Sequence, residues 1–380
     1  MQITLPVELF AHLVNISARV IKSNINIPIL RNILLSFEKD HMRILATDLE
    51  TQLSAKLEVK PGVTEKFTVH STTFAQYLTS LSQEQTLTLV KEEKKLVVKG
   101  AKSSASFIVK PADEYPTLDV EQVEEVAQLP KEDLINALDR TLFAVSKDDL
   151  RPILTGVHFN VSKDFAELVG LDTYRLSWVK IPAKSKKEFK ITVPFTGLQN
   201  LLKILKDGFL DTYVDKDTVT ILLGQGGNNT EGVVIFRYGI IDITVRLLEG
   251  EYPNYKEIIP QENKMKLSIN TAQFTEALRR AGIFAQNSVN QRVILEIKPK
   301  KMYIKASAEE TGQVEEELPI THSGELKELT VGFQYRFLQD IMSILSTDEF
   351  TFETNGAINP AIFREKDNAD FIHIVMPLKL

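Results

Sequence analysis

Pro28-Ile29-Leu30 lies near the start of the chain, and Pro152-Ile153-Leu154 repeats it 124 residues later. Leu5-Pro6 recurs as Leu129-Pro130 with the same offset. A constant offset between separate motifs indicates that a whole folding unit has been copied. The unit is roughly 120–140 residues long, which is a usual domain size and far exceeds a solenoid repeat of about 20–50 residues.

A third copy is visible in the spacing of apolar residues rather than in identity. In each copy an apolar stripe at helical spacing is followed 63 or 64 residues later by a second stripe. The stripes begin at Phe10 and Phe74, at Leu134 and Leu198, and at Phe274 and Phe337. We therefore expect three repeated domains, at residues 1–127, 128–262 and 263–380.

Each copy has the same order of expected elements. The first helices are expected at residues 6–22, 130–146 and 271–286, and the second helices at 71–82, 195–206 and 333–346. Strands are expected between them, for example at 33–37, 86–90 and 293–297. Pro6 and Pro130 are expected in the first helical turn, where a missing backbone N–H costs nothing. The pattern predicts an α+β fold in which two helices per domain pack on antiparallel sheet.

The composition is that of a globular protein. Of the 380 residues, 43% are hydrophobic and 25% are charged. No apolar run approaches the roughly 18 residues of a spanning helix. The N-terminus lacks the basic segment and apolar core of a signal peptide, so we expect a cytoplasmic protein. The absence of cysteine excludes disulfides, thiolate catalysis and cysteine-ligated zinc.

No pattern of residues predicts a catalytic or metal site, and no cofactor is expected. The six histidines lack metal-ligand spacing. Gly100-Ala101-Lys102-Ser103 lacks the first glycine and the following helix of a phosphate loop, so we expect a hairpin turn. Asp48 and Asp172, 124 residues apart, are expected to stabilise turns in two different domains. An enzyme acting on nucleic acid or nucleotides, with either aspartate as a metal ligand, remains the alternative.

The net charge is −6, so DNA binding would need basic residues gathered on one surface. His12, Asn15, Arg19 and Lys22 share one face of the first expected helix, opposite its apolar stripe. The candidate DNA-facing residues of the whole chain are Arg19, Lys22, Arg140, Lys147, Lys203, Lys206, Arg279 and Arg280. An ordinary solvated helix face is the alternative, because acidic residues are interspersed.

Four segments carry a resemblance to a known family. They are Arg151–Val157, Asp172–Leu176, Glu249–Tyr255 and the C-terminal Val375–Leu380. Together with Pro28-Ile29-Leu30 and the tripled repeat, they resemble the bacterial DNA polymerase III beta subunit, the replicative sliding clamp, over the whole chain. The resemblance implies a head-to-tail homodimer whose six domains of the DNA-clamp fold form a closed ring around duplex DNA. It also implies that helices line the hole and that the protein catalyses nothing.

The resemblance further implies interfaces and partners. Double-stranded DNA would be held without sequence preference. The replicative DNA polymerase, the clamp loader, other DNA polymerases and repair proteins would bind the ring. The dimer interface would contain Phe107, Ile108, Ile283 and Phe284, although the residues alone fit the interior of a domain equally well. A three-domain peptide-binding adaptor that does not encircle DNA remains the alternative function.

The family's peptide pocket would lie between the second and third domains and accept motifs with a glutamine and a terminal Leu-Phe pair. Its residues here would be Arg151, Leu154, Thr155, Leu171, Asp172, Tyr174, Arg175, Leu176, Pro253, Ile258, Ile358, Pro360, Val375, Met376, Pro377 and Leu378. The apolar members would receive the Leu-Phe anchor, with methionine adapting to varied ligands. Arginines at the rim would bond peptide carbonyls.

Some positions depart from the family pattern. Thr173-Tyr174 stands where Gly or Ser followed by His is frequent, Glu257 where a basic residue is common, and Lys379 where Arg is usual. These changes bear on peptide preference. Asn24 occupies a loop position where the family often has a basic residue, and Lys22 is hypothesised to substitute for it.

Overall fold

The computed structural model describes residues 1–22, 26–214, 217–226 and 232–380. Its contacts group these residues into two compact units. Unit 1 comprises residues 1–135, 183–188 and 193–249, and unit 2 comprises 136–182, 189–192 and 250–380. Each unit therefore contains part of the second repeat, and the three domain boundaries drawn from the sequence stay a prediction.

Helices begin within two residues of the expected positions. They are α1 (Val7–Ala18), α2 (Ser71–Ser80), α3 (Lys131–Thr141), α4 (Phe195–Asp207), α5 (Thr271–Ala285) and α6 (Tyr335–Met342). The second helix of each copy begins 64 residues after the first, which confirms the tripled repeat. None of the helices in the described ranges is long and apolar enough to cross a membrane.

Two details of the sequence prediction are wrong. The buried counterpart of Phe74 and Leu198 in α6 is Leu338, whereas Phe337 is half-buried. Pro6 does not enter the helix: it has φ −62° and ψ 128°, caps α1 and ends strand β1 (Gln2–Pro6). Because β1 is the edge strand of its sheet, the missing N–H of Pro6 leaves no ladder bond unmade. Pro130 likewise ends a strand.

Unit 1 contains a thirteen-stranded antiparallel sheet with the order β1-β6-β7-β8-β5-β2-β3-β4-β17-β16-β15-β9-β13. Its other strands are β2 (Asn32–Phe37), β3 (His41–Thr47), β4 (Thr51–Glu58), β5 (Glu65–His70), β6 (Thr86–Lys91), β7 (Lys95–Lys99), β8 (Ser104–Pro111), β9 (Val120–Pro130), β13 (Lys184–Ser185), β15 (Thr218–Gly226), β16 (Gly232–Tyr238) and β17 (Ile241–Arg246). The β7–β8 connection at Gly100 to Ser103 is the hairpin turn expected there.

A nine-stranded sheet, almost all of it in unit 2, has the order β14-β10-β11-β12-β26-β25-β24-β18-β22. Its strands are β10 (Gly156–Val161), β11 (Phe165–Leu171), β12 (Arg175–Pro182), β14 (Phe189–Pro194), β18 (Met265–Asn270), β22 (Thr321–Gly324), β24 (Glu349–Thr354), β25 (Ala361–Glu365) and β26 (Phe371–Val375). A separate sheet of unit 2 has the order β21-β20-β19-β23. It contains β19 (Arg292–Lys298), β20 (Lys301–Ala308), β21 (Gly312–Pro319) and β23 (Leu329–Gln334).

The nine strands from β5 to β13 in unit 1 correspond one for one to the nine-stranded sheet of unit 2. In both, a strand from one repeat pairs with a strand from the next. Seam 1 is the β4–β17 pair, with Thr51 opposite Val245, and seam 2 is the β12–β26 pair, with Arg175 opposite Val375. The seams therefore provide equivalent backbone frames in which side chains can be compared position by position.

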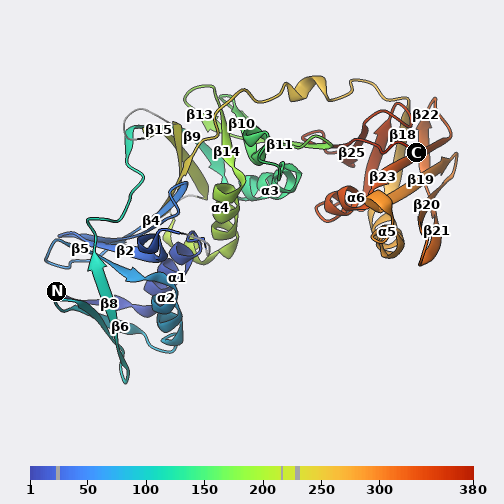
Figure 1. Ribbon diagram of the computed structural model, residues 1–380. Coiled ribbons are helices and arrows are strands. Elements are labelled where there is room, and N and C mark those ends of the chain that lie inside the picture. The colour runs from blue at the N-terminus through green and yellow to red at the C-terminus, as the bar shows by residue number, and fades with distance from the viewer. Residues whose placement is uncertain (23–25, 215–216, 227–231) are drawn as a thin grey trace. The chain divides into compact units, whose positions relative to one another are not determined.

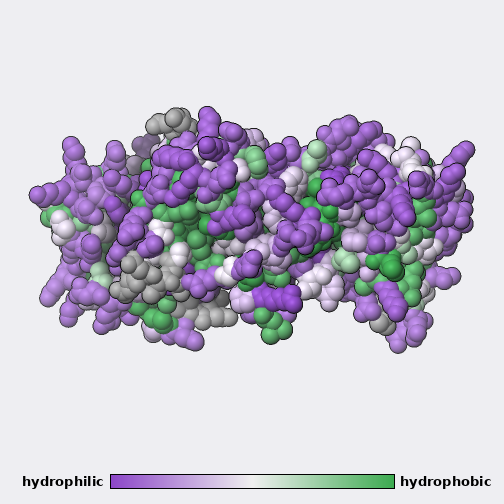
Figure 2. Space-filling model, turned by 90° about the horizontal axis from the view of Figure 1, so that it is seen from above, coloured by the Kyte–Doolittle hydropathy of each residue, from purple (hydrophilic) through white to green (hydrophobic). Residues whose placement is uncertain are grey.

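Helices cover the sheets and close the cores. In unit 1, α1 lies beside α2 and contacts β3 and β4, and in unit 2, α5 lies beside α6 and contacts β20 and β21 (Figure 1). The Phe10 and Phe74 rings meet edge to face 6.0 Å apart, and both are fully buried. Burial of each such ring stabilises the fold by roughly 2–3 kcal/mol. On the face seen in Figure 2, hydrophobic residues form small separate patches within a mainly hydrophilic surface.

Candidate functional site

The turns that precede β4 and β12 are built alike. Asp48 accepts hydrogen bonds from the backbone N–H groups of Glu50 (3.0 Å) and Thr51 (2.7 Å). Asp172 accepts them from Tyr174 (2.7 Å) and Arg175 (2.8 Å). The predicted turn role of both aspartates is confirmed. Within the described ranges, no group of three or more His, Asp or Glu side chains is placed to hold a metal.

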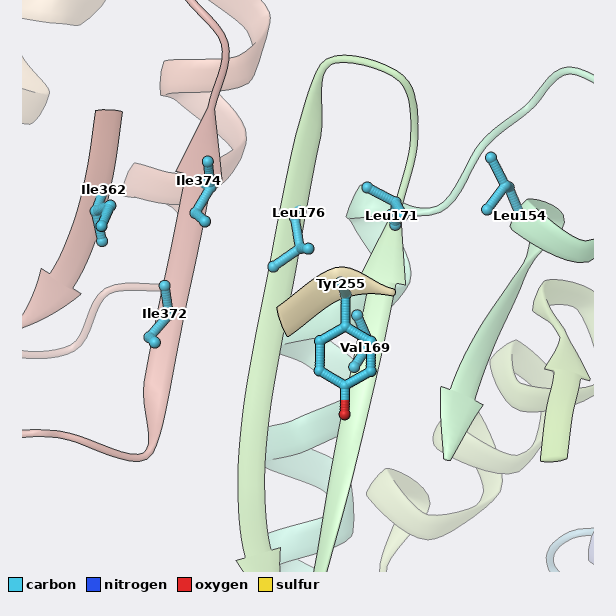
Figure 3. Close-up of a cluster of buried hydrophobic side chains, with 8 residues drawn as sticks. All are labelled: Leu154, Val169, Leu171, Leu176, Tyr255, Ile362, Ile372 and Ile374. Carbon is cyan, nitrogen blue, oxygen red and sulfur yellow. The ribbon is translucent and has the colours of Figure 1, made fainter. Parts of the chain in front are cut away.

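An apolar cluster lies at seam 2, entirely within unit 2. Its buried members are Leu154, Val169, Leu171, Leu176, Tyr255, Ile362, Ile372 and Ile374 (Figure 3). They come from β11, β12, β25 and β26, from the short 3₁₀ turn Pro152–Thr155, and from the turn Tyr255–Glu257 in the linker between β17 and β18. Leu154, Leu171 and Leu176 were predicted from the sequence. Val169, Ile362, Ile372 and Ile374 were not, because they lie in strands that look like any other buried strand, and neither was Tyr255 of the 3₁₀ turn.

Large hydrophobic side chains stay exposed beside this cluster. The start of β12 and the ends of β11, β24 and β26 lie at the same end of the sheet, as the strand registers show. At that end Tyr174 is 58% exposed, Ile358 82% and Met376 38%. Leu150, one residue before Arg151, is 86% exposed and was not predicted. We call Leu150, Tyr174, Ile358 and Met376 the rim.

The C-terminal tail is fixed at two points. The backbone N–H of Met376 donates to the carbonyl of Tyr174 (2.8 Å), and that of Leu378 donates to the carbonyl of Gly332 (2.8 Å). The tail is therefore bound on one side to the turn before β12 and on the other to β23. This anchorage places Met376 at the rim rather than in a frayed end.

Arg175 is buried, and each of its three side-chain nitrogens donates a hydrogen bond. Its Nε donates to Asp172 (3.1 Å), and its two terminal nitrogens bond Asp340 and the carbonyl of Phe143. The guanidinium also lies over the rings of Phe143 and Phe337. Arg151, in contrast, is exposed.

The other predicted pocket residues also lie in unit 2. Val375 is buried; Thr155, Ile258, Pro360, Pro377 and Leu378 are half-buried; Pro253 is exposed. Asp172 is half-buried at the turn that it stabilises. Of the departures from the family pattern, Tyr174 is at the rim, and Glu257 and Lys379 are exposed.

The carboxylate of Glu167 holds two aromatic side chains of the apolar cluster and its surroundings by hydrogen bonds. Glu167 accepts hydrogen bonds from the Tyr255 hydroxyl (2.9 Å) and the Trp178 indole (3.1 Å), and Lys256 lies 3.2 Å away. Burial by itself would raise the pKa of Glu167, but the hydrogen bonds from Tyr255, Lys256 and Asn160 outweigh it and lower the pKa. Burial raises the pKa of Tyr255. The linker tyrosine is thus fixed on β11 by a charged acceptor.

Two buried histidines flank this region. His373 in β26 is fully buried, neither ring nitrogen has a hydrogen-bond partner, and its ring lies among Phe143, Phe363 and Arg175. Burial, with a smaller effect of Arg175, lowers the pKa of His373 to about 3. Burial and Lys190 lower the pKa of His158 to about 4. Both rings are neutral at pH 7.

Many of the candidate DNA-facing residues have internal acidic neighbours. Arg19 lies 3.6 Å from Asp207, and Lys22 bonds Asp48 (2.9 Å) and Glu50 (2.7 Å). Arg140 bonds the buried Glu365 (2.8 Å), Arg279 bonds Glu276 (3.0 Å), and Arg280 bonds Glu316 (2.7 Å). Lys147, Lys203 and Lys206 are exposed. The positive field of these helices is therefore weak, and Asn24 lies outside the described residues.

The four predicted interface residues lie at two edges. In β8, the half-buried Phe107 contacts Phe74 and Tyr77, and Ile108 is 76% exposed. In α5, Ile283 is 61% exposed and Phe284 is half-buried near Gly312 of β21. In unit 2, an open hollow of about 1080 Å³ is lined by β19, β20, β21 and the segment after α5. Phe107 thus belongs partly to its own domain's core, whereas Ile108 and Ile283 face outward.

Comparison with known families covers almost the whole chain. The DNA polymerase III beta subunit N-terminal domain matches residues 1–119, the central domain matches 128–254, and the C-terminal domain matches 256–379.

Full-length relatives agree in name. The chain is 25% identical to the beta sliding clamp of Bacillus subtilis, over 95% of each chain. It is 25% identical to the beta sliding clamp of Pseudomonas putida over the full length of both.

Solved structures agree in fold. The DNA polymerase III subunit beta of Pseudomonas aeruginosa superposes with a TM-score of 0.90 at 25% identity, covering 100% of both chains. The beta subunit of Thermotoga maritima superposes with a TM-score of 0.89 at 21% identity, covering 100% of this chain and 99% of that one.

Proposed function

This chain belongs to the DNA polymerase III beta subunit family, and from that premise we propose how it acts as a DNA sliding clamp. Two copies would close head to tail into a ring around duplex DNA. The ring would tether the replicative polymerase by topological linkage rather than by tight DNA binding.

The observation that carries this proposal is the edge position of β21, whose counterparts β4 and β12 lie in seams 1 and 2. The sheet β23-β19-β20-β21 corresponds to β5-β2-β3-β4, so β21 takes the place of β4 and β12. The strands β8-β7-β6-β1 of unit 1 correspond to β17-β16-β15-β9, so β8 takes the place of β17 and β26. β8 pairs with β7 over Ser104–Ile108 and with β5 over Val109–Pro111, so its first five residues have β7 as their strand neighbour in the described chain. Within the described chain, β21 has β20 as its only sheet neighbour. Antiparallel pairing of β21 in one copy with β8 in the next would repeat seams 1 and 2 and cover an exposed strand edge.

Charge and apolarity favour the same pairing. Around β8 the chain carries Lys94, Lys95, Lys99, Lys102 and Lys110, and in and before β21 it carries Glu309, Glu310, Glu315, Glu316 and Glu317. Opposite charges would steer the edges together, and the exposed Ile108 and Ile283 would be covered. Head-to-tail contacts of this kind close into a ring when the rotation permits.

Sequence-independent DNA contact would come from the helices. The proposed contacts are Arg19, Lys22, Arg140, Lys147, Lys203, Lys206, Arg279 and Arg280. Because several of these residues also form ion pairs with carboxylates of the same chain, their affinity for DNA phosphates would be weak and sensitive to salt. Weak contact suits a ring that must slide.

We propose that the apolar cluster and rim at seam 2 receive short peptides from polymerases, the clamp loader and repair proteins. The buried floor would accept a Leu-Phe anchor, the exposed rim would close over it, and Arg151 would bond the peptide backbone. All these groups bind rather than react, so the chain would be a non-enzymatic scaffold working in the cytoplasm. A peptide-binding adaptor without encirclement is the alternative function, and the DNA experiment below separates the two.

The ring is tested by topology. The protein would be loaded by a clamp loader and ATP onto nicked circular plasmid, and half of the sample would then be cut once and passed through a gel-filtration column. A ring stays on the circle and leaves the linear DNA. Retention on both forms would contradict the ring, because contact binding does not depend on DNA ends.

The interface is tested by mass. Light scattering of the wild type is expected to give twice the chain mass of 42.9 kDa. Ile108→Glu would place a carboxylate beside the acidic β21 edge and is expected to give the chain mass. The control Val63→Glu changes another exposed apolar residue of unit 1 and should leave the dimer intact. A wild-type monomer at micromolar concentration would contradict the proposal.

A further inference from the structure

The ring of Phe337 lies between two residues of the turn at seam 2. The Arg175 guanidinium lies over one part of it, 4.7 Å from the ring centre. Tyr174 stacks on it with centroids 6.1 Å apart and planes 28° apart. Phe337 belongs to α6, whereas Tyr174 lies in the turn before β12 and Arg175 is the first residue of that strand. The stack therefore joins a helix of the third repeat to the rim.

The same helix holds the turn at a second point. Asp340, three residues after Phe337 and so on the same side of α6, bonds the Arg175 guanidinium. Arg175 is almost fully buried, so this attachment is rigid, whereas Tyr174 is 58% exposed and has Phe337 as its aromatic support. An exposed ring without such support would sample several rotamers and lose them on binding a ligand.

Seam 1 lacks this arrangement although its backbone is equivalent. There Thr51 takes the place of Arg175, Glu50 that of Tyr174, and Gly197 that of Phe337. A Cβ on Gly197 would lie 2.6 Å from Val245, so no side chain fits at that position of α4. The fold can therefore be built without the stack, and the stack occurs at the seam that carries the apolar cluster and rim.

We propose that Phe337 is a positioning residue for peptide binding: it holds the Tyr174 ring at the rim so that the ring is preorganised for the peptide's apolar anchor. This inference rests on the proposed peptide site. Preorganised aromatic contacts raise affinity because less side-chain freedom is lost when the ligand binds. Phe337 itself does not need to touch the peptide.

The test uses the full-length protein and a fluorescein-labelled synthetic peptide with a glutamine and a terminal Leu-Phe pair, followed by anisotropy. Phe337→Ala should weaken binding about tenfold, since an aromatic pair contributes up to about that factor. Phe337→Tyr should bind within about twofold of the wild type, because it restores the stack. Phe337→Leu should be nearly as weak as Phe337→Ala, because it fills space without stacking.

A double-mutant comparison shows whether Phe337 acts through Tyr174. Tyr174→Ala and the double variant should bind equally weakly, since removing the support of an absent ring costs nothing. Tyr213→Ala, an exposed aromatic of unit 1, is the matched control and should bind as the wild type does. Dimer mass should be unchanged in all variants, and thermal melts should show that each variant is folded at the temperature of the binding assay.

Each contrary result has a distinct meaning. Wild-type affinity in Phe337→Ala overturns this inference and leaves the peptide site standing. Full recovery by Phe337→Leu, or additive losses in the double variant, also overturns it, because Phe337 would then act by packing or on its own. A wild-type protein that ignores the Leu-Phe peptide overturns the proposed site and this inference with it.

Discussion

Seam 1 and seam 2 share a backbone and differ in chemistry. In each, an aspartate accepts hydrogen bonds from two backbone N–H groups of the turn. In each, too, the backbone N–H of a residue on the partner chain segment donates to the carbonyl of the turn residue two positions after that aspartate. Arg246 donates to Glu50 (3.0 Å) in seam 1, and Met376 donates to Tyr174 (2.8 Å) in seam 2. The repeated fold is therefore specified by turns and strand pairing that tolerate very different side chains.

The side chains decide what each seam can bind. Seam 1 has Gln52 where seam 2 has Leu176, and the Gln52 side chain accepts a hydrogen bond from the linker residue Leu118 (2.9 Å). Both partners are buried. In seam 1, the segment between β8 and β9 therefore covers the position of Gln52 and forms a hydrogen bond with it. In seam 2, the apolar cluster lies beside the exposed hydrophobic residues of the rim. A duplicated fold can reserve ligand binding for one seam by exchanging a few residues.

The largest difference should appear when the turn aspartates are removed. Asp172→Ala leaves the buried Arg175 without one of its two carboxylates and should destabilise unit 2 by about 3 kcal/mol. Asp48→Ala should destabilise unit 1 by only about 1 kcal/mol, because its partner Lys22 is about half exposed and returns to water. Hydrogen exchange of the β12 and β4 amides measures each cost. Equal costs would show that the burial of Arg175 does not distinguish the seams.

Exchanging the equivalent residues Leu176 and Gln52 should change peptide binding while the fold stays the same. Leu176→Gln buries an amide without a partner and removes an apolar contact, so peptide affinity should fall about a hundredfold, near 3 kcal/mol. Gln52→Leu is the reciprocal control in seam 1 and should leave peptide affinity unchanged. Fluorescence anisotropy with the Leu-Phe peptide measures both. Binding by Leu176→Gln within twofold of the wild type would place the peptide elsewhere.

The seams should also respond differently to acid. His373 in seam 2 corresponds to Ile243 in seam 1. The folded pKa of His373 is about 3, below the ordinary 6.5, so below pH 6.5 the unfolded chain takes up a proton that the folded one refuses. The free energy of unfolding should therefore decrease as the pH falls below 6.5, and at pH 5 it should be lower by about 2 kcal/mol.

His373→Ile should remove that loss in unit 2. The single tryptophan, Trp178 in β12, lies opposite Ile372 of β26 and reports urea unfolding of this unit. We expect the drop in stability between pH 7.5 and pH 5 to shrink by about 2 kcal/mol in the variant. An unchanged drop would assign the acid sensitivity to other groups, with His158 next in order.

The smallest expected effect concerns Lys22. Its ion pairs with Asp48 and Glu50 are solvent-accessible, so Lys22→Ala should lower stability by less than about 1 kcal/mol. DNA contact should weaken slightly and become less sensitive to salt, as measured by clamp loading on plasmid at several salt concentrations. Unchanged loading and salt dependence would remove Lys22 from the DNA-facing set.

Local patterns were sufficient to predict much of the fold. Helix positions, the Gly100 hairpin and the turn role of both aspartates follow from periodicity and turn chemistry, which act over a few residues. Register errors of one residue occurred where apolar neighbours compete: Phe337 and Leu338 are both hydrophobic, and only packing shows that Leu338 is the core residue. The expected ends of α1, α3 and α6, at residues 22, 146 and 346, lie four or five residues beyond the observed ends at Ala18, Thr141 and Met342.

The candidate site was predicted only in part. Leu154 and Leu176 lie in recognisable motifs, but Val169 and Ile362 are strand residues that become part of the apolar cluster when β12 pairs with β26. The exposed Leu150 next to Arg151 has no sequence pattern that marks it. The pairing of Arg140 with Glu365, 225 residues away, also depends on long-range folding.

The sequence by itself determined the tripled repeat, the order of helices and strands, and the turns, because these depend on propensities and spacings within short segments. The tertiary structure decided that Arg175 is buried and shared with Asp340, that the Phe337 ring stacks on Tyr174, and that β21 lies at the edge of its sheet within the described chain. Burial, ion pairing and free edges arise only when distant segments meet, since each depends on what the rest of the chain leaves covered or open.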